Sequence, residues 1–372
     1  GSFFMKKSLI IAAIAGIFAV PSAMAAEVNG GIAAGIDRSK VSGSANSAQN
    51  VSATRISSGY TNISVSHSEE FDNGMSGDLF IQLHLPITTA GAPDSSVNNR
   101  NSYVGISGGF GSVRLGTNEN AYERMLYQHS AHDGDWSYGT ISIMGIAPAG
   151  AGNDAGLRSH IWDRTDNTLM YFGPDGPLKI EMDYVFGGSG TTATRTPSLL
   201  SLALEYDMGG VGLFAGYQVA TDWAGNGTTP TSARDDSALL FGAEFTMGDL
   251  SANVAMETLE YKDTTNNVST ERSAFMVNAT YPLASGNLAL TYTNADDSDE
   301  SNAGTNTTTN DGATGLYVGY YHPMGESTTL WAMYGKIKND DAGTYNFATW
   351  HASPGAAGQD YTNYVFGIKH VF

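Results

Sequence analysis

The last twelve residues, Tyr361 to Phe372, most constrain the fold because their character alternates along the chain. One face of an extended strand carries Tyr364, Phe366, Ile368, His370 and Phe372, and the other carries Asn363, Gly367 and Lys369. A terminal strand with a mostly apolar outer face needs a partner on both edges. If that face meets lipid, closure is compulsory, because hydrocarbon offers no hydrogen bonds to an open edge. We therefore predict that this strand closes a ring with the first strand.

The start of the chain predicts export. Lys6 and Lys7 follow Met5, an apolar run extends from Leu9 to Val20, and Ala23-Met24-Ala25 supplies small residues for cleavage. We interpret residues 5–25 as a cleaved signal peptide and residues 1–4 as additions before the natural start. Removing 25 of 372 residues leaves a chain of 347, and losing two lysines moves the formal charge from −19 to −21. Residues 26–372 are then one barrel domain.

Composition narrows the class of protein further. The surplus of acids argues against nucleic acid as a partner, since phosphate neutralisation needs bases. The chain has no cysteine, which excludes disulfides and thiolate metal sites. With 45 glycines and 19 tyrosines but only 11 prolines, it has the composition of many strands and tight turns. An exported, acidic chain of this kind fits a transmembrane β-barrel.

Alternating segments of about ten residues recur from Val28 onward, as transmembrane strands require. In one, Leu178, Ile180, Met182, Tyr184 and Phe186 lie opposite Lys179, Glu181 and Asp183. Short turns such as Asp207-Met208-Gly209-Gly210 alternate with long polar connections such as Thr221 to Asp236. We count sixteen segments and predict an all-β, antiparallel barrel of about sixteen strands.

Several stretches of the chain resemble the trimeric general porins of Gram-negative outer membranes. The resemblance rests on residues Arg100 to Ile106 running through Gly109 to Gly116, on Arg164 to Tyr171, and on the ending Phe366 to Phe372. The Pro-Glu-Phe-Gly-Gly turn that many such porins carry in their third loop is absent from this sequence. The resemblance implies a homotrimer in the cell outer membrane, in contact with lipid and lipopolysaccharide.

The resemblance also implies a pore constriction. The longest connection, roughly Asn118 to His160, matches the loop that folds into the barrel in that family. The expected constriction residues are the loop acids Glu119, Glu123, Asp133 and Asp135 and the wall arginines Arg55, Arg100 and Arg164. Arg114 joins them by its parity opposite Val113 and Leu115. Opposed charges across a narrow lumen would orient water and polar solutes. The alternative is that the acids are only solvated loop residues.

The parity of Arg55 raises a difficulty. It places Arg55 on the face of Ile63 and Val65, so either a bulge near Gly59 intervenes or the assigned face is wrong. Tyr103 has two readings as well, as a pore residue or as a trimer contact.

Other functions are less well supported by the sequence. His129, His132, Asp133, Asp135 and His160 suggest a metal site, but no recognised ligand spacing is met, so we expect no metal. No nucleophile-elbow sequence is present, and we expect no enzyme activity and no cofactor. We predict a water-filled channel for passive diffusion of small hydrophilic solutes and ions. The alternatives are a solute-selective channel and a barrel that serves mainly as an adhesin or anchor.

Overall fold

The computed structural model describes residues 26–43, 50–59, 61–85, 87, 97–132, 142–145, 164–187, 197–222, 235–302, 305–346 and 356–372. The predicted signal peptide, Asp133, Asp135 and His160 lie outside these ranges. Among the described residues, no helix is long and apolar enough to cross a membrane.

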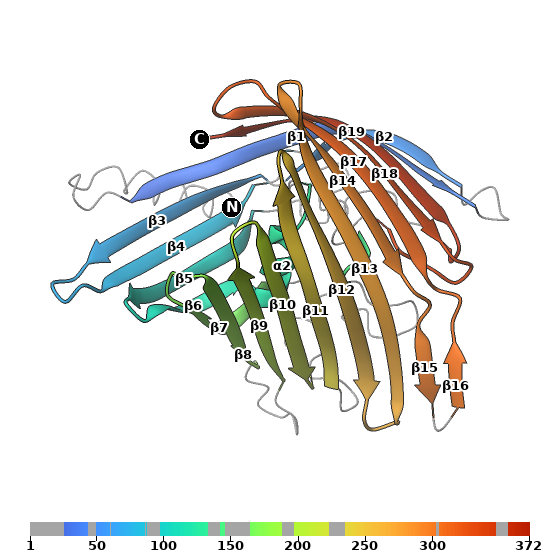
Figure 1. Cartoon of the computed structure of the whole chain (residues 1–372), viewed down its shortest axis with the longest axis horizontal. Helices are drawn as coiled ribbons and strands as arrows, with labels where there is room; N and C mark the ends of the chain where they lie inside the picture. The colour runs from blue at the N-terminus through green and yellow to red at the C-terminus, as the bar shows by residue number, and fades with distance from the viewer. Residues whose placement is uncertain are drawn as a thin grey trace, which may run out of the picture.

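Strands make up most of the described chain, with one α-helix between the sixth and seventh strands (Figure 1). In order, the elements are β1 (Glu27–Ser42), β2 (Ser52–Ser58), β3 (Asn62–Glu70), β4 (Ser76–His84), β5 (Asn98–Gly108), β6 (Gly111–Glu119), α2 (Ala121–Gln128), β7 (Arg164–Phe172), β8 (Leu178–Phe186), β9 (Ser198–Asp207), β10 (Val211–Thr221), β11 (Asp235–Met247), β12 (Leu250–Asp263), β13 (Val268–Leu283), β14 (Gly286–Ala295), β15 (Asp299–Asn302), β16 (Thr305–Thr308), β17 (Ala313–Pro323), β18 (Thr328–Asn339) and β19 (Asp360–Val371).

These segments form one closed antiparallel barrel of sixteen strands. β2 and β3 both pair with β1 and are two parts of one interrupted barrel strand, and β14 and β15, which both pair with β13, are two parts of another. β16 pairs with β15 and leads into β17, so these two also form one barrel strand, and the nineteen segments make sixteen barrel strands. The predicted strand number and antiparallel order are confirmed.

The first and last strands close the ring. Twelve residue pairs join β1 to β19, from Gly31 opposite Val371 to Ser42 opposite Asp360. Beyond them, Gly30 and Phe372 exchange two backbone hydrogen bonds, each 3.0 Å long. The predicted closure by the terminal strand is confirmed.

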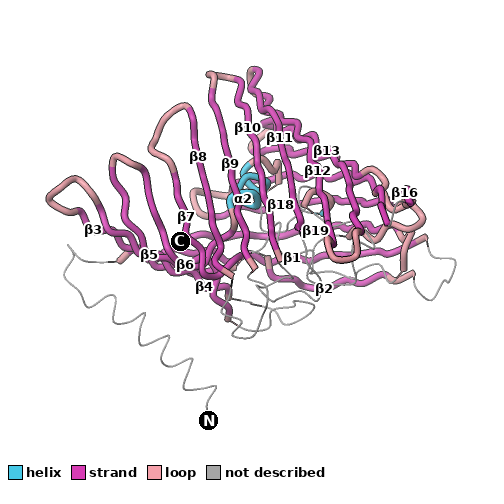
Figure 2. The backbone as a smooth tube through the Cα atoms, turned by 90° about the horizontal axis from the view of Figure 1, so that it is seen from below, coloured by secondary structure: helices cyan, strands magenta, loops and turns pink. Residues whose placement is uncertain are grey.

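The two faces of the wall differ as the alternation predicts. Phe366 and Leu115 point outward and are 58% and 56% exposed, while Asp183 and Ser201 point inward and are fully buried. The connections at residues 71–75, 173–177 and 208–210 lie at the end of the barrel where β1 begins and β19 ends (Figure 2). We call this the short-turn end and the opposite one the long-loop end.

The interruption between β2 and β3 resolves the face of Arg55. Arg55 lies opposite Asp37 in the register, and its Nε atom is 3.5 Å from the buried Asp37 carboxylate, so it points inward. Ile63 and Val65 pair with the outward-facing Leu83 and Ile81. The faces of the chain therefore exchange between β2 and β3, which agrees with the first of the two alternatives, an irregularity between Arg55 and Ile63.

Candidate functional site

Helix α2 packs on the inner wall of the barrel. The Asn120 side chain caps it by accepting a hydrogen bond of 2.9 Å from the Glu123 backbone N–H. The Tyr122 N–H donates to the Ser201 hydroxyl of β9 at 2.9 Å. Tyr122 also lies on Gly216 of β10, where an added Cβ would come within 3.1 Å of the ring. Close approach at this glycine lets the helix bury its apolar face against the strands.

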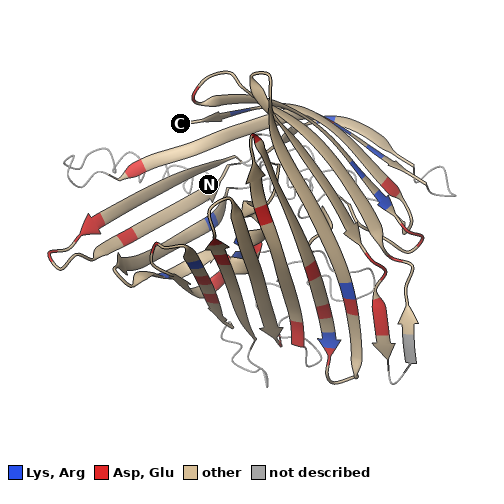
Figure 3. Ribbon diagram, viewed as in Figure 1, with Lys and Arg blue, Asp and Glu red and all other residues tan. Residues whose placement is uncertain are grey.

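A buried ion pair ties the inner segment to two other strands. Arg272 Nη2 of β13 lies 2.7 Å from Glu257 Oε1 of β12, and both side chains are fully buried. The same carboxylate accepts hydrogen bonds from the Tyr122 hydroxyl at 2.8 Å and from the Gly145 N–H at 2.8 Å. Arg272 also donates to the Ile143 carbonyl at 3.2 Å. One charge pair thus anchors both α2 and residues 142–145. Figure 3 shows the acidic and basic segments of β12 and β13 side by side.

Arg124 makes a second link between α2 and the wall. Its guanidinium lies 2.7 Å from Glu181 and 3.0 Å from Asp183, both on β8. Burial alone would lower the pKa of Arg124, but the Asp183 and Glu181 carboxylates outweigh that effect and raise it. Arg124 therefore keeps its charge, and it also lies 4.8 Å above the Phe172 ring.

Two of the wall arginines predicted from the sequence, Arg114 and Arg164, lie on the neighbouring strands β6 and β7. Arg114 of β6 lies between the rings of Tyr103 and Phe172, 4.5 Å from each centroid, and donates to the Ser112 hydroxyl at 3.1 Å. Arg164 of β7 pairs with Glu119 of β6, and donates to Asn101 at 3.0 Å. Tyr103 therefore lies on the inner face with Arg114, where its pore reading places it.

The other described residues of the predicted constriction contact side chains outside the predicted set. Arg100 lies 3.4 Å from the buried His84 of β4, while Arg55 pairs with Asp37 on β1. Glu123 is buried within the first turn of α2. The acid nearest to a predicted arginine is thus Glu119, which lies on the adjacent strand to Arg164 and not across the lumen.

Sequence reasoning missed the residues that hold the inner segment in place. Arg124, Glu257 and Arg272 carried no site prediction, although strand alternation puts Glu257 opposite the outward Val254 and Met256. Alternation reveals which charges face inward. It does not reveal which of them meets a loop from a distant part of the chain.

Two histidines, His129 and His132, follow the C-terminal end of α2. His129 stacks on Phe214 with centroids 3.7 Å apart and lies between Glu244, at 3.2 Å, and Glu205, at 3.8 Å. Burial lowers the pKa of His129 despite these carboxylates. Burial lowers the pKa of His132 to about 4, and its Nδ1 lies 3.3 Å from the Tyr321 hydroxyl. Within the described ranges, no group of three or more His, Asp or Glu residues is arranged to hold a metal ion.

Comparisons with known proteins agree with this architecture. The family model described as Gram-negative porin matches residues 11–342. Outer membrane porin protein 32 of Delftia acidovorans is 25% identical over 73% of this chain and 74% of its own length. Outer membrane protein U of Vibrio vulnificus (strain CMCP6) is 24% identical over 49% of this chain and 48% of its own.

Solved structures share the fold. The anion-selective porin from Comamonas acidovorans superposes with a TM-score of 0.76 at 20% identity, covering 93% of this chain and 99% of that one. OmpT of Vibrio cholerae in its trimer form gives a TM-score of 0.67 at 15% identity, with 93% and 99% coverage. The barrel has an apolar outer face and a charged inner face, and the family model matches most of the chain. The chain therefore belongs to the Gram-negative porins and forms a channel in the outer membrane.

Proposed function

We propose that this porin is a general diffusion channel whose lumen is narrowed by the segment that begins with α2. The observation that carries the proposal is the anchoring of α2 and residues 142–145 on the inner faces of β8, β9, β12 and β13. A segment held there takes up lumen cross-section, and its charges face the path of solutes. Solutes would pass by diffusion without catalysis or any energy source.

We further propose a weak preference for cations. Near α2 and the residues that follow it, the acids with ion-pair contacts are Glu181, Asp183, Glu205, Glu244 and Glu257, and the arginines and lysines that pair with them are Arg124, Arg272 and Lys179. The acids of this set outnumber the lysines and arginines, and most members pair locally. The chain as a whole carries a formal charge of −19, which would enrich cations at the mouths of the pore.

The lining of the lumen should favour the passage of polar solutes over that of apolar solutes. Fixed charges and oriented dipoles line the wall, so an apolar solute would displace ordered water without replacing its hydrogen bonds. Planar-bilayer recording tests the proposal: purified protein should give ohmic conductance steps, and the reversal potential in a salt gradient should indicate weak cation preference. A protein that inserts and folds without conducting would contradict it.

The assembly we propose is a homotrimer surrounded by outer-membrane lipid and lipopolysaccharide. The trimer form of OmpT supports it by shared fold. Exposed outward side chains such as Ile36, Val104 and Phe366 supply apolar surface for lipid or for neighbouring subunits. Light scattering with correction for bound detergent should give three chains per particle.

A further inference from the structure

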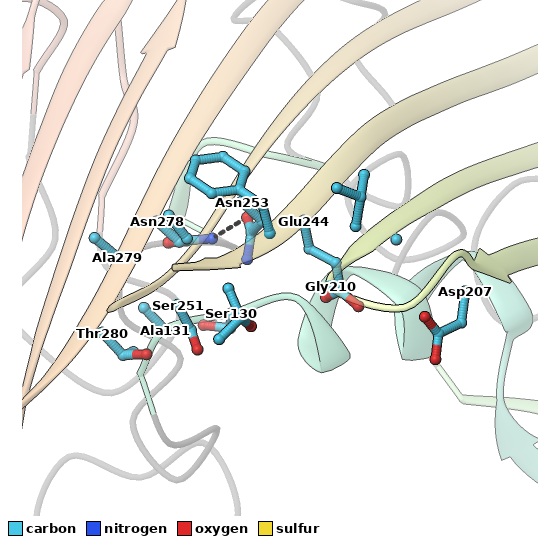
Figure 4. A pocket seen from close by; sticks show the side chains of 15 residues that line it. Ser130, Ala131, Asp207, Gly210, Glu244, Ser251, Asn253, Asn278, Ala279 and Thr280 are labelled. Carbon is cyan, nitrogen blue, oxygen red and sulfur yellow. Dashed lines mark hydrogen bonds between the residues drawn. The ribbon is translucent and has the colours of Figure 1, made fainter. Parts of the chain in front are cut away.

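A cavity of about 320 Å³ lies inside the barrel near the short-turn end. Ser130 and Ala131, just after α2, form one side, and inner positions of β10 to β13 form the other (Figure 4). This volume corresponds to about ten waters at the liquid share of roughly 30 Å³ each. A molecule the size of a single sugar ring therefore fits.

Strand register builds the polar wall of this cavity. Glu244 pairs with Asn253, which pairs with Asn278, and these three form one row across β11, β12 and β13. The next row toward the short-turn end consists of Thr246, Ser251 and Thr280, joined in the same register. Their strand neighbours Phe245 and Val254 are exposed on the outer face. Six polar side chains thus form a two-row patch facing the lumen.

The first row also fixes the loop that covers the patch. The Asn278 amide donates to the His129 carbonyl at 2.7 Å and to the Asn253 side-chain oxygen at 3.0 Å. The Asn253 amide donates to the same carbonyl at 2.9 Å. These carboxamides hold Ser130 and Ala131 in place. The hydroxyls of Thr246 and Ser251, both exposed, and the Glu244 carboxylate then remain to meet a solute.

The cavity is negatively charged. Among the described residues, its lining includes the carboxylates of Asp207 and Glu244 and no lysine or arginine. The Glu244 side chain is 53% exposed, and it packs over Gly212, where an added Cβ would lie 2.8 Å from its Cγ. The Nδ1 atom of His129 lies 3.2 Å from the Glu244 carboxylate, but burial lowers the pKa of His129, so near neutral pH His129 leaves the carboxylate charge uncompensated. Lys179, further along the wall, pairs with Glu205 at 3.2 Å.

We propose that this cavity is a low-affinity subsite for small hydroxylated organic cations, such as protonated amino sugars. The ammonium group meets Glu244 and Asp207, and the solute hydroxyls exchange hydrogen bonds with Thr246, Ser251 and Thr280. The proposal rests on the proposed function, because a solute reaches the cavity only through a conducting lumen or its mouth. It adds a preferred solute class and a position for it, beside the path of ions.

The test uses glucosamine and glucose as probes, which differ in one amine group. Single-channel currents are recorded in slightly acidic buffer, with each sugar added on the side of the short-turn end. Glucosamine should cause brief concentration-dependent current blocks, and glucose should cause far fewer. Glu244→Gln should weaken the glucosamine block about three- to fivefold, the effect of losing one water-exposed ion pair. Asp175→Asn, which removes an exposed acid on the β7–β8 turn outside the cavity, should leave the block unchanged.

Equal block by the two sugars, or an undiminished block in Glu244→Gln, would overturn the subsite while leaving the channel intact. A folded protein without conductance would instead contradict the proposed function. In that case, saturation-transfer NMR on the protein in detergent still decides the subsite: glucosamine signals attenuated in the unmodified protein and restored in Glu244→Gln support it, and identical spectra refute it.

Discussion

Glu257 and Arg272 form a fully buried ion pair, 2.7 Å apart, that also binds Tyr122 and Gly145 of the inner segment. Removing one partner of a buried pair leaves an uncompensated charge and typically costs about 3 to 5 kcal/mol. Glu257→Gln or Arg272→Met should therefore loosen the docking of α2, giving noisier single-channel currents and faster proteolysis after residue 120.

Two comparisons separate this effect from a general loss of stability. The double variant E257Q/R272M removes both charges and should be milder than either single variant. Lys179→Met breaks an ion pair whose lysine is 63% exposed and should change docking by less than about 1 kcal/mol. Single-channel currents that stay as quiet in Glu257→Gln and Arg272→Met as in the unmodified protein would show that the pair does not anchor the segment.

Deleting Phe372 should lower the yield of folded barrel. Its backbone exchanges two hydrogen bonds with Gly30, and its ring extends the apolar outer face of β19. Losing this end shortens the seam that closes the ring, so more of the chain should stay unfolded when transferred to lipid. The folded fraction is measured by the gel shift between heated and unheated samples. Truncation without any change in that fraction would contradict the role of the seam.

Arginine at Leu202, on the lipid face of β9, should cost about 2 to 4 kcal/mol near the bilayer midplane. Arginine at Ser251, an exposed inner position of β12, should be tolerated. The choice of control depends on the structure, because Ser201 and Asp183 face inward but are buried beneath α2 and Arg124. Folding titrations in lipid give both free energies, and equal costs would mean that the two faces are misassigned.

Acidification should weaken the docking of the residues after α2 through His132. Burial holds the pKa of His132 at about 4, below its ordinary value of 6.5, so the undocked segment binds a proton more readily. Docking is therefore complete above pH 6.5 and loses up to roughly 3 kcal/mol as the pH falls toward 4. Hydrogen exchange of α2 amides, corrected for intrinsic pH dependence, should accelerate across this window.

The variant His132→Gln should lose most of that acceleration. His322→Gln, at a half-buried position near the short-turn end of β17, should retain it. Exchange rates in the unmodified protein that stay constant between pH 7 and 4 would contradict the assignment.

The barrel could be predicted from sequence alone, because a wall between lipid and water requires apolar and polar side chains to alternate with a period of two along every strand. That period identifies the inner positions of Glu257 and Asp183 as well as the closing strand. It fails where the register breaks, as between β2 and β3, because parity cannot be carried across an irregularity. It also fails for the contacts of α2, since Tyr122 and Glu257 meet across 135 residues of sequence and no local pattern records that meeting.

The most direct test of the account is the reversal potential of single channels in a salt gradient, measured for the unmodified protein and for variants of the Glu119–Arg164 pair. The Debye length is about 8 Å at physiological salt, so the charges nearest the ion path, those near α2, should dominate over acids that lie farther away. We predict ohmic conductance with weak cation preference that fades as salt rises. Arg164→Gln should raise that preference, and Glu119→Gln should lower it. Absence of conductance, strong anion preference in the unmodified protein, or no response to either substitution would contradict the account.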